Sequence, residues 1–146
     1  MLIMKQEYKK LLLQDLCTRL PYGVKIQTDY IDVKTLEGIE SPDYICISDG
    51  CYSLDYMECK PYLFPLSSMT EEQLKEMQEI IGNPNEACIS VNTSGLELWL
   101  NSVDTDPTIW LDTIFEVQDW LNRNHFDYRG LIEKGLAIEA TGLNIY

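Results

Sequence analysis

The stretch MTEEQLKEMQEIIG, residues 69–82, contains the residues that begin and end an α-helix. Thr70 suits the N-cap and Gln73 the third helical position, and together these two residues form a capping box. Gly82 suits the residue after the helix, where a left-handed conformation is common. Between them, apolar residues recur at helical spacing, so the segment predicts a helix that buries one face. The rest of the chain must supply a surface for that face.

Two further helices are predicted, one earlier and one later in the sequence. Helical spacing of apolar residues predicts one over about residues 4–19, which Pro21 and Gly23 end. Another opens with Asp106 as N-cap and Pro107 as first residue, and continues to about Asn124. We expect a wide apolar stripe of this third helix to lie across a sheet: Trp110, Leu111, Ile114, Phe115, Val117, Trp120 and Leu121.

The strands are predicted from two-residue alternation and from turn residues. Val24, Ile26 and Thr28 share one face of a strand, and further extended stretches follow at 31–36, 44–47 and 51–54 as a small antiparallel meander with a turn at 48–50. ACISV and LELWL flank turn residues and predict a hairpin. The order of elements predicts an α+β fold, with residues 1–146 as a single domain whose mainly antiparallel sheet has helices packed on one face.

Charge is unevenly distributed along the chain. The net charge is -13. Residues 1–25 hold five basic and two acidic side chains, a balance of +3, so the remaining residues carry -16. Such a surface repels phosphate backbones, and we expect no direct nucleic-acid binding. It could instead meet a basic partner or mimic a nucleic acid, or simply keep the protein in solution.

The five cysteines and the hydropathy pattern predict where the protein works. No apolar run approaches the roughly 20 residues that cross a bilayer, and charge interrupts the first 20 residues every few positions. We therefore expect a cytoplasmic protein.

An odd number of cysteines with irregular gaps is a poor disulfide framework, and C-x4-C-x7-C lacks a zinc knuckle. We expect buried thiols and no metal at any of them: Cys17, Cys46, Cys51, Cys59 and Cys88.

The segment NRNHFDYRG, residues 122–130, holds the only histidine. If it were extended, His125, Asp127 and Arg129 would share one face and could serve as a general base for acyl or phosphoryl chemistry. The favoured interpretation is structural. There Asn124 ends a helix in the left-handed conformation, Asp127 caps a short helix YRGLIEKG, and its last glycine ends that helix.

A second candidate segment is PYLFP, residues 61–65. Tyr62 and Phe64 lie on one side of an extended segment and could bind a partner protein. The alternative, which we favour, is a buried edge segment whose prolines prevent further strand pairing. No nucleotide-binding or metalloprotease motif is present and no carboxylate pair resembles a metal cluster, so we expect no cofactor.

Three blocks resemble a group of short, uncharacterised gut-bacterial proteins from prophages and mobile elements. The blocks are LLLQDLCTRLPYGVKI, KPYLFPLSSMTEEQ and DWLNRNHFDYRGLIEKGLAIEA, residues 11–26, 60–73 and 119–140. The resemblance implies an intracellular accessory protein and carries no catalytic residue. The leading hypothesis is a non-enzymatic accessory protein acting through protein–protein contacts. The alternatives are a small hydrolase or nuclease using His125, Asp127 and Arg129, and an acidic nucleic-acid mimic. A homodimer is also possible, because an open sheet edge favours self-pairing.

Overall fold

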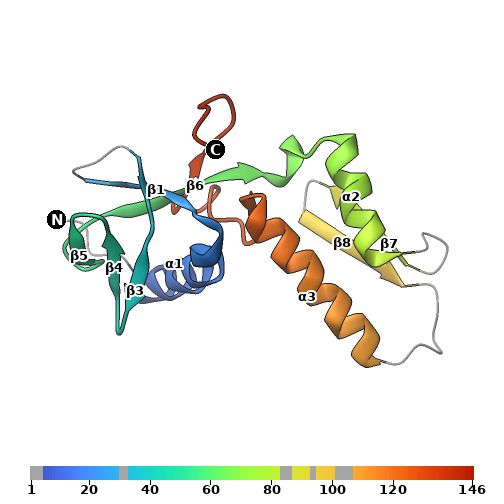
Figure 1. The fold of residues 1–146 in the computed structure, drawn as a ribbon, viewed down its shortest axis with the longest axis horizontal. Helices are drawn as coiled ribbons and strands as arrows, with labels where there is room; N and C mark the ends of the chain where they lie inside the picture. Colours follow the sequence, from blue (N-terminus) through green and yellow to red (C-terminus); the bar gives the residue numbers. More distant parts are fainter. Residues whose placement is uncertain (1–4, 30–32, 83–86, 93–94, 101–106) are drawn as a thin grey trace. The chain divides into compact units, whose positions relative to one another are not determined.

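The computed structural model describes residues 5–29, 33–82, 87–92, 95–100 and 107–146 (Figure 1). Its helices and antiparallel sheets confirm the α+β class. The chain forms two compact units: a first unit of residues 1–64 and 129–146, and a second unit of residues 65–128. In the described part of the chain, no helix is both long and apolar enough to cross a bilayer.

Helix α1 (Gln6–Arg19) confirms the first predicted helix. Leu12 and Leu16, both in the predicted apolar stripe, are fully buried. Asp15 and Arg19 are fully buried as well, because they lie three and seven positions after Leu12 and therefore on the same side of the helix. The apolar pattern alone did not predict these two charged residues inside the fold.

The chain turns after α1 and enters a strand. A short 3-10 turn, η1 (Leu20–Tyr22), is followed by Gly23 with a φ of 67°, in the left-handed region that glycine adopts without strain. Strand β1 (Lys25–Thr28) then shows the predicted alternation, since Ile26 and Thr28 are buried and the residues beside them are half-buried.

Strand β1 pairs antiparallel with β2 (Lys34–Thr35) and with β6 (Cys59–Pro65). Strand β10 (Ile138–Glu139) runs parallel to β6, which gives the order β10-β6-β1-β2. The predicted edge position of PYLFP is wrong, because β6 has a neighbour on each side. Pro61 lies opposite Ile26 and has no N–H to donate. The two preceding residues, Cys59 and Lys60, still pair with β1.

The predicted turn at residues 48–50 is confirmed within a separate antiparallel sheet. Strands β3 (Gly38–Glu40), β4 (Tyr44–Ile47) and β5 (Gly50–Ser53) lie side by side in that order (Figure 1). Ile47 pairs with Gly50, so a two-residue loop joins β4 to β5. One face of the sheet packs on the core through Ile45 and Ile47. The strands thus divide into separate sheets, where the sequence predicted one main sheet.

The hydrophobic core of the first unit contains residues from both of its chain segments, 1–64 and 129–146. Its buried members are Leu12, Leu16, Val24, Ile26, Leu36, Ile45, Ile47, Leu54, Met57, Cys59, Leu63, Leu131, Leu136 and Ala137. The terminal residue Tyr146 is held by its hydroxyl, which accepts from the Lys25 N–H at 2.9 Å and donates to the Tyr62 carbonyl at 2.7 Å. One side chain therefore fastens the end of the chain to both β1 and β6.

The second unit opens with η2 (Leu66–Ser68) and helix α2 (Glu71–Ile81). The predicted capping box is present: the Gln73 N–H donates to the Thr70 hydroxyl at 3.1 Å, and the Thr70 N–H donates to the Gln73 side-chain oxygen at 2.9 Å. Gly82 follows the helix with a φ of 102°. The helix begins and ends where predicted, but Gly82, with a ψ of -137°, does not adopt the predicted left-handed helical conformation.

The predicted hairpin and third helix complete the second unit. Strands β7 (Ala87–Asn92) and β8 (Gly95–Leu100) pair antiparallel, and helix α3 (Pro107–Arg123) begins at the predicted proline. Helix α2 contacts both β7 and α3. The predicted cap Asp106 and the side chain of Trp110 lie outside the described residues.

The burial predicted for the α3 stripe is wrong at its first half. Trp120 and Leu121 are buried, and the Trp120 ring stacks on Phe126 with centroids 5.7 Å apart. Leu111, Ile114 and Phe115 are 50%, 46% and 54% exposed. The helix therefore buries its C-terminal turns and leaves the apolar residues of its earlier turns at the surface.

The segment after α3 departs from the prediction at two points. The left-handed residue is His125, with a φ of 61°, and not Asn124. Asp127 lies in a short strand, β9 (Phe126–Asp127), and caps no helix. The predicted helix YRGLIEKG is instead a series of turns. Its final glycine, Gly135, does adopt a positive φ of 72°, and Leu136 donates its N–H to the Leu131 carbonyl at 2.9 Å.

Candidate functional site

A hollow of about 800 Å³ follows the exposed side of α1 in the first unit. Its lining residues from α1 recur at helical spacing: Gln6, Lys9, Lys10, Leu13, Gln14, Cys17 and Thr18. Pro42, Asp43, Asp55 and Arg129 complete the lining. The hollow is within the size range of small-ligand sites. Most of its lining residues are polar or charged, but the surface that they present to it is mostly apolar.

Lys9 stands between two carboxylates in this hollow. Its ammonium lies 2.5 Å from an Asp43 oxygen and 2.7 Å from an Asp55 oxygen. The hydrogen bonds that the Lys9 ammonium donates to Asp43 and Asp55 raise the pKa of Lys9 above its ordinary value, and the bond donated to Asp55 lowers the pKa of that carboxyl group. The amine is therefore protonated at neutral pH, so it serves as an ion-pair partner and not as a nucleophile or base.

The pKa shifts predict how this cluster responds to pH. The lowered pKa of Asp55 means that its contribution to stability is present above pH 3.8 and is lost as the pH falls through the folded-state pKa. The raised pKa of Lys9 means that its contribution is present below pH 10.5 and is lost only at higher pH. We expect the stability difference between the wild type and Asp55→Asn, measured by urea unfolding, to stay constant from pH 5 to 9 and to shrink below pH 3.8. A difference that changes across the neutral range would contradict this assignment.

Behind the hollow, Asp15 binds two arginines. Its Oδ2 lies 2.8 Å from Arg19 Nε, with both side chains fully buried, and its Oδ1 lies 3.3 Å from Arg129 Nε. Arg129 is 22% exposed at its side chain and reaches the hollow, whereas Arg19 does not line it. The sequence predicted Arg129 as a possible catalytic group, but the structure places its guanidinium against the carboxylate of α1.

The other two members of that candidate group belong to the second unit. His125 and Asp127 are each 8% exposed. His125 closes the end of α3 by donating its N–H to the Asn122 carbonyl at 3.2 Å. The hollow along α1 is lined by Arg129 and has neither His125 nor Asp127 among its lining residues.

The candidate binding residues Tyr62 and Phe64 lie on β6. Tyr62 is buried, at 4% exposure, as the favoured interpretation of PYLFP predicted. Phe64 is half-buried, and its ring lies 5.9 Å from that of Tyr146. The Tyr62 side chain is therefore in the interior, and the Phe64 ring packs near that of Tyr146.

Several apolar residues of α3 are exposed at the surface of the second unit. We call Leu111, Ile114 and Phe115 the α3 patch; they recur at i, i+3 and i+4 and therefore lie together on one side of the helix. Large contiguous apolar surface marks interaction sites in soluble proteins. The sequence predicted these residues as an apolar stripe, but the pattern alone does not say whether such a stripe faces a core or a partner.

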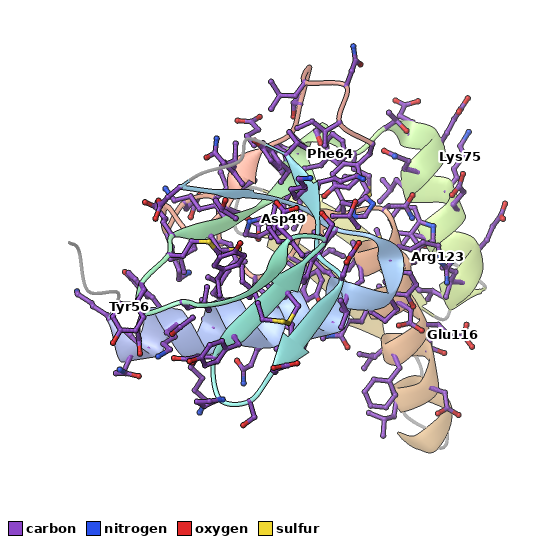
Figure 2. All side chains as sticks on the ribbon, turned by 60° about the vertical axis from the view of Figure 1, so that its left-hand side comes forward. Asp49, Tyr56, Phe64, Lys75, Glu116 and Arg123 are labelled. Atoms are coloured by element: carbon purple, nitrogen blue, oxygen red, sulfur yellow. A yellow bond between two sulfur atoms is a disulfide. The ribbon has the colours of Figure 1, made fainter. Side chains whose placement is uncertain are left out.

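Acidic residues border the α3 patch. Asp112, Glu116 and Asp119 follow one another at i, i+4 and i+7 and are all exposed (Glu116 is labelled in Figure 2). The second unit as a whole has twelve acidic and two basic side chains, a net charge of -10. The first unit has twelve acidic and nine basic side chains, a net charge of -3. Most of the negative charge of the protein is thus on the unit that carries the patch.

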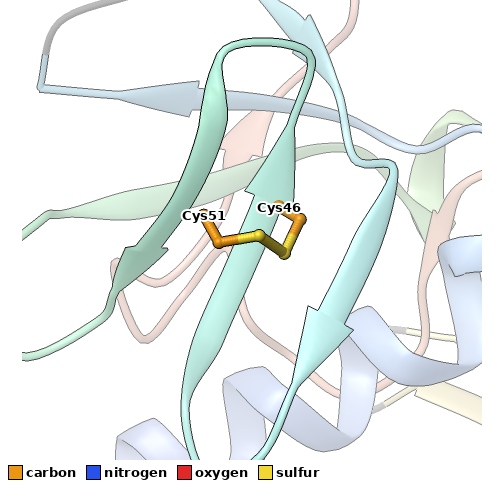
Figure 3. The surroundings of a disulfide bond; sticks show 2 residues. All are labelled: Cys46 and Cys51. Atoms are coloured by element: carbon orange, nitrogen blue, oxygen red, sulfur yellow. A yellow bond between two sulfur atoms is a disulfide. The ribbon is translucent and has the colours of Figure 1, made fainter.

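Three of the five cysteines differ from the prediction, and the side chain of Cys88 lies outside the described residues. Cys46 and Cys51 form a disulfide between β4 and β5 (Figure 3), which corrects the expectation of reduced thiols at these positions. Cys17 is a free thiol and is exposed, so its predicted burial is also wrong. Cys59 is buried as predicted, and burial raises the pKa of its thiol to about 12, which makes it unreactive at neutral pH.

Comparisons of the chain with models of protein families, with curated proteins and with solved structures find no match in any of the three.

Proposed function

We propose that this chain is a non-enzymatic accessory protein that acts through protein–protein contacts, and that the α3 patch is its binding surface. The observation that carries the proposal is the exposure of Leu111, Ile114 and Phe115, each close to half of its surface, on one side of a well-formed helix. Binding energy in protein interfaces concentrates in a few large apolar or aromatic side chains, and Phe115 is the natural anchor of this group.

The expected partner is a protein segment with an apolar face bordered by lysine or arginine. Asp112, Glu116 and Asp119 border the patch, so lysines or arginines beside an apolar face would meet opposite charge. A second copy of the same unit is a poor occupant, because two units of net charge -10 repel each other. Self-association through a sheet edge remains a separate prediction, which the mass of the protein in solution would test.

The biological setting rests on the three sequence blocks. Their resemblance to short prophage and mobile-element proteins supports a role as an accessory of such an element, acting in the cytoplasm of a bacterial host. The alternative is a hydrolase or nuclease that uses His125, Asp127 and Arg129. In the structure the Arg129 guanidinium lies 3.3 Å from the buried carboxylate of Asp15.

A synthetic helical peptide with leucines on one face and lysines on the other tests the binding surface. We expect it to bind the wild-type protein in a fluorescence titration, and a scrambled peptide of the same composition to bind at least tenfold more weakly. Ile114→Glu with Phe115→Glu should weaken binding by at least thirtyfold, since loss of an interface anchor costs about 2 kcal/mol or more.

Tyr56→Glu is the matched control for this test, because Tyr56 is an exposed aromatic residue, at 74% exposure, on the first unit (Figure 2). It should leave the affinity unchanged within about twofold. Equal loss in both variants, or equal binding of the scrambled peptide, would show attraction to acidic charge alone and would refute the α3 patch as the binding surface.

The regular spacing of the exposed acids on α3 favours a second candidate within the same class, a mimic of nucleic acid. Such a mimic also binds a protein, but at that protein's nucleic-acid site. Capture of the host partner by wild-type protein, followed by competition with duplex DNA, separates the two candidates. Displacement by DNA supports mimicry, and capture that DNA does not affect supports the apolar contact.

A further inference from the structure

One face of the β3-β4-β5 sheet carries three side chains of types that can bind a metal ion. Side chains alternate between the two faces of a strand. Ile45 is buried on the core face of this sheet, so the side chain of the next residue, Cys46, lies on the outer face. In the register of the sheet, Gly38 pairs with Cys46 and Cys46 pairs with Cys51. Glu40 is two residues after Gly38 on the same strand, so it is a diagonal neighbour of Cys46 on this outer face.

The ligand atoms of these three residues lie close to one another. The two sulfur atoms and a carboxylate oxygen of Glu40 are all within 4.8 Å of each other. Cys51 and Glu40 are exposed, and Cys46 is half-buried. Gly38 keeps the space beside Cys46 open, because a Cβ added there would lie 3.4 Å from the Cys46 Cβ and 3.9 Å from its sulfur. Zinc binds thiolates at about 2.3 Å and carboxylates at about 2.0–2.2 Å, so ligand atoms this close can share one ion after small side-chain rotations.

We propose that reduction of the Cys46–Cys51 disulfide creates a binding site for one zinc ion, held by the thiolates of Cys46 and Cys51 and the carboxylate of Glu40. In the disulfide both sulfurs are bonded to each other, and neither is a thiolate ligand. The site is therefore available only in the reduced protein. Three protein ligands leave the fourth tetrahedral position open to water or to a group from outside the chain.

The chemistry of the switch balances with a dithiol as the reductant. The dithiol gives two electrons and two protons to the Cys46–Cys51 bond, which breaks into two thiols, and the dithiol itself becomes a disulfide. Zinc then binds the two thiolates, and their two protons pass to solvent. Oxidation by another disulfide reverses the first step and releases the ion.

Metal titration of the full chain in both redox states tests the proposal. Protein reduced with a phosphine, which is not itself a thiol ligand, should bind one equivalent of Co²⁺ with thiolate-to-cobalt absorption in the near ultraviolet. Zn²⁺ should displace the Co²⁺ and abolish that absorption. Oxidised protein, its disulfide verified by mass spectrometry, should bind at least a hundredfold more weakly.

Variants identify the ligands. Cys46→Ser and Cys51→Ser should each lower the affinity of the reduced protein at least a hundredfold, and Glu40→Gln at least tenfold. Cys17→Ser is the matched control, since Cys17 is an exposed thiol outside the group, and it should bind as the wild type does. Gly38→Val should also weaken binding by covering the space beside Cys46, with circular dichroism to verify the fold.

Two results would overturn the zinc site. One is reduced wild-type protein that binds no Co²⁺. The other is a folded Cys46→Ser/Cys51→Ser variant that keeps the thiolate absorption, which would assign the ion to other cysteines. Both results leave the α3 patch proposal unaffected, because that proposal concerns residues of the second unit and uses a different probe.

Discussion

Asp15→Asn is expected to lower the free energy of unfolding by about 3–5 kcal/mol, the cost of removing one partner from a buried ion pair. Asp15 and Arg19 are both fully buried and lie 2.8 Å apart, so the variant leaves the Arg19 charge inside the fold without its carboxylate. Asn keeps the size of Asp, so the loss reports charge and not a cavity. Urea unfolding at neutral pH measures it.

Asp55→Asn is the matched control, because it also removes a carboxylate from an ion pair with a helix α1 side chain. Asp55 is 52% exposed at its side chain, and water replaces much of the lost interaction. We expect a much smaller loss of stability than in Asp15→Asn. Similar losses in the two variants would mean that the Asp15 pair is solvated in solution and is not part of the core.

A double variant separates two effects on the free energy of unfolding: the loss caused by removing one charge of the pair, and the net contribution of the whole ion pair. Asp15→Leu with Arg19→Met replaces the two fully buried charges by apolar side chains, and such replacements are often neutral or stabilising. The Asp15–Arg129 ion pair is lost in the double variant and in Asp15→Leu alike, so it does not affect their comparison. We therefore expect the double variant to be more stable than Asp15→Leu alone. If the double variant is instead less stable by the sum of the two single losses, the two side chains do not interact, and the pair assignment fails.

Features set by neighbouring residues were predicted well from the sequence. The capping box of α2, the proline that begins α3 and the turn before Gly50 each depend on chemistry within a few positions, and all three are present. The same turn pairs Ile47 with Gly50, and one residue further along each strand Cys46 pairs with Cys51. The disulfide could therefore have been predicted from the position of the turn. The overall count of cysteines gave the opposite expectation, because it ignores which cysteines a hairpin places side by side.

Features that depend on distant parts of the chain were predicted poorly. Asp15 is inside the fold because Arg19 and Arg129 compensate its charge, and Arg129 is far away in sequence. Glu40 joins the cysteine pair only through the β3-β4 register, which the sequence does not specify. The α3 stripe has one apolar pattern along its length, yet Leu121 is buried and Phe115 is exposed, since burial depends on which elements pack beside each turn.

Reversing the acidic border of the α3 patch is expected to slow association with the leucine–lysine peptide by about 10- to 100-fold at low salt. Asp112→Lys with Glu116→Lys keeps a like-charge pair at i and i+4 while changing its sign, so helix stability should change little. Charges at the rim of an interface mainly steer the encounter, so the dissociation rate should stay close to that of the wild type. Stopped-flow fluorescence measures both rates.

Salt dependence and a charge reversal on the first unit decide whether the acidic border of the α3 patch acts through its own charges. The screening length falls from about 30 Å at 0.01 M salt to about 3 Å at 1 M, so the two association rates should converge as salt increases. Glu133→Lys with Glu139→Lys makes the same change in net charge at exposed sites on the first unit and should slow association far less. If the reversal on the first unit slows association as much as the reversal on α3, the peptide responds to the total charge of the protein. In that case the acidic residues beside the α3 patch have no local effect on binding. The proposal that the partner carries complementary charge would then be wrong.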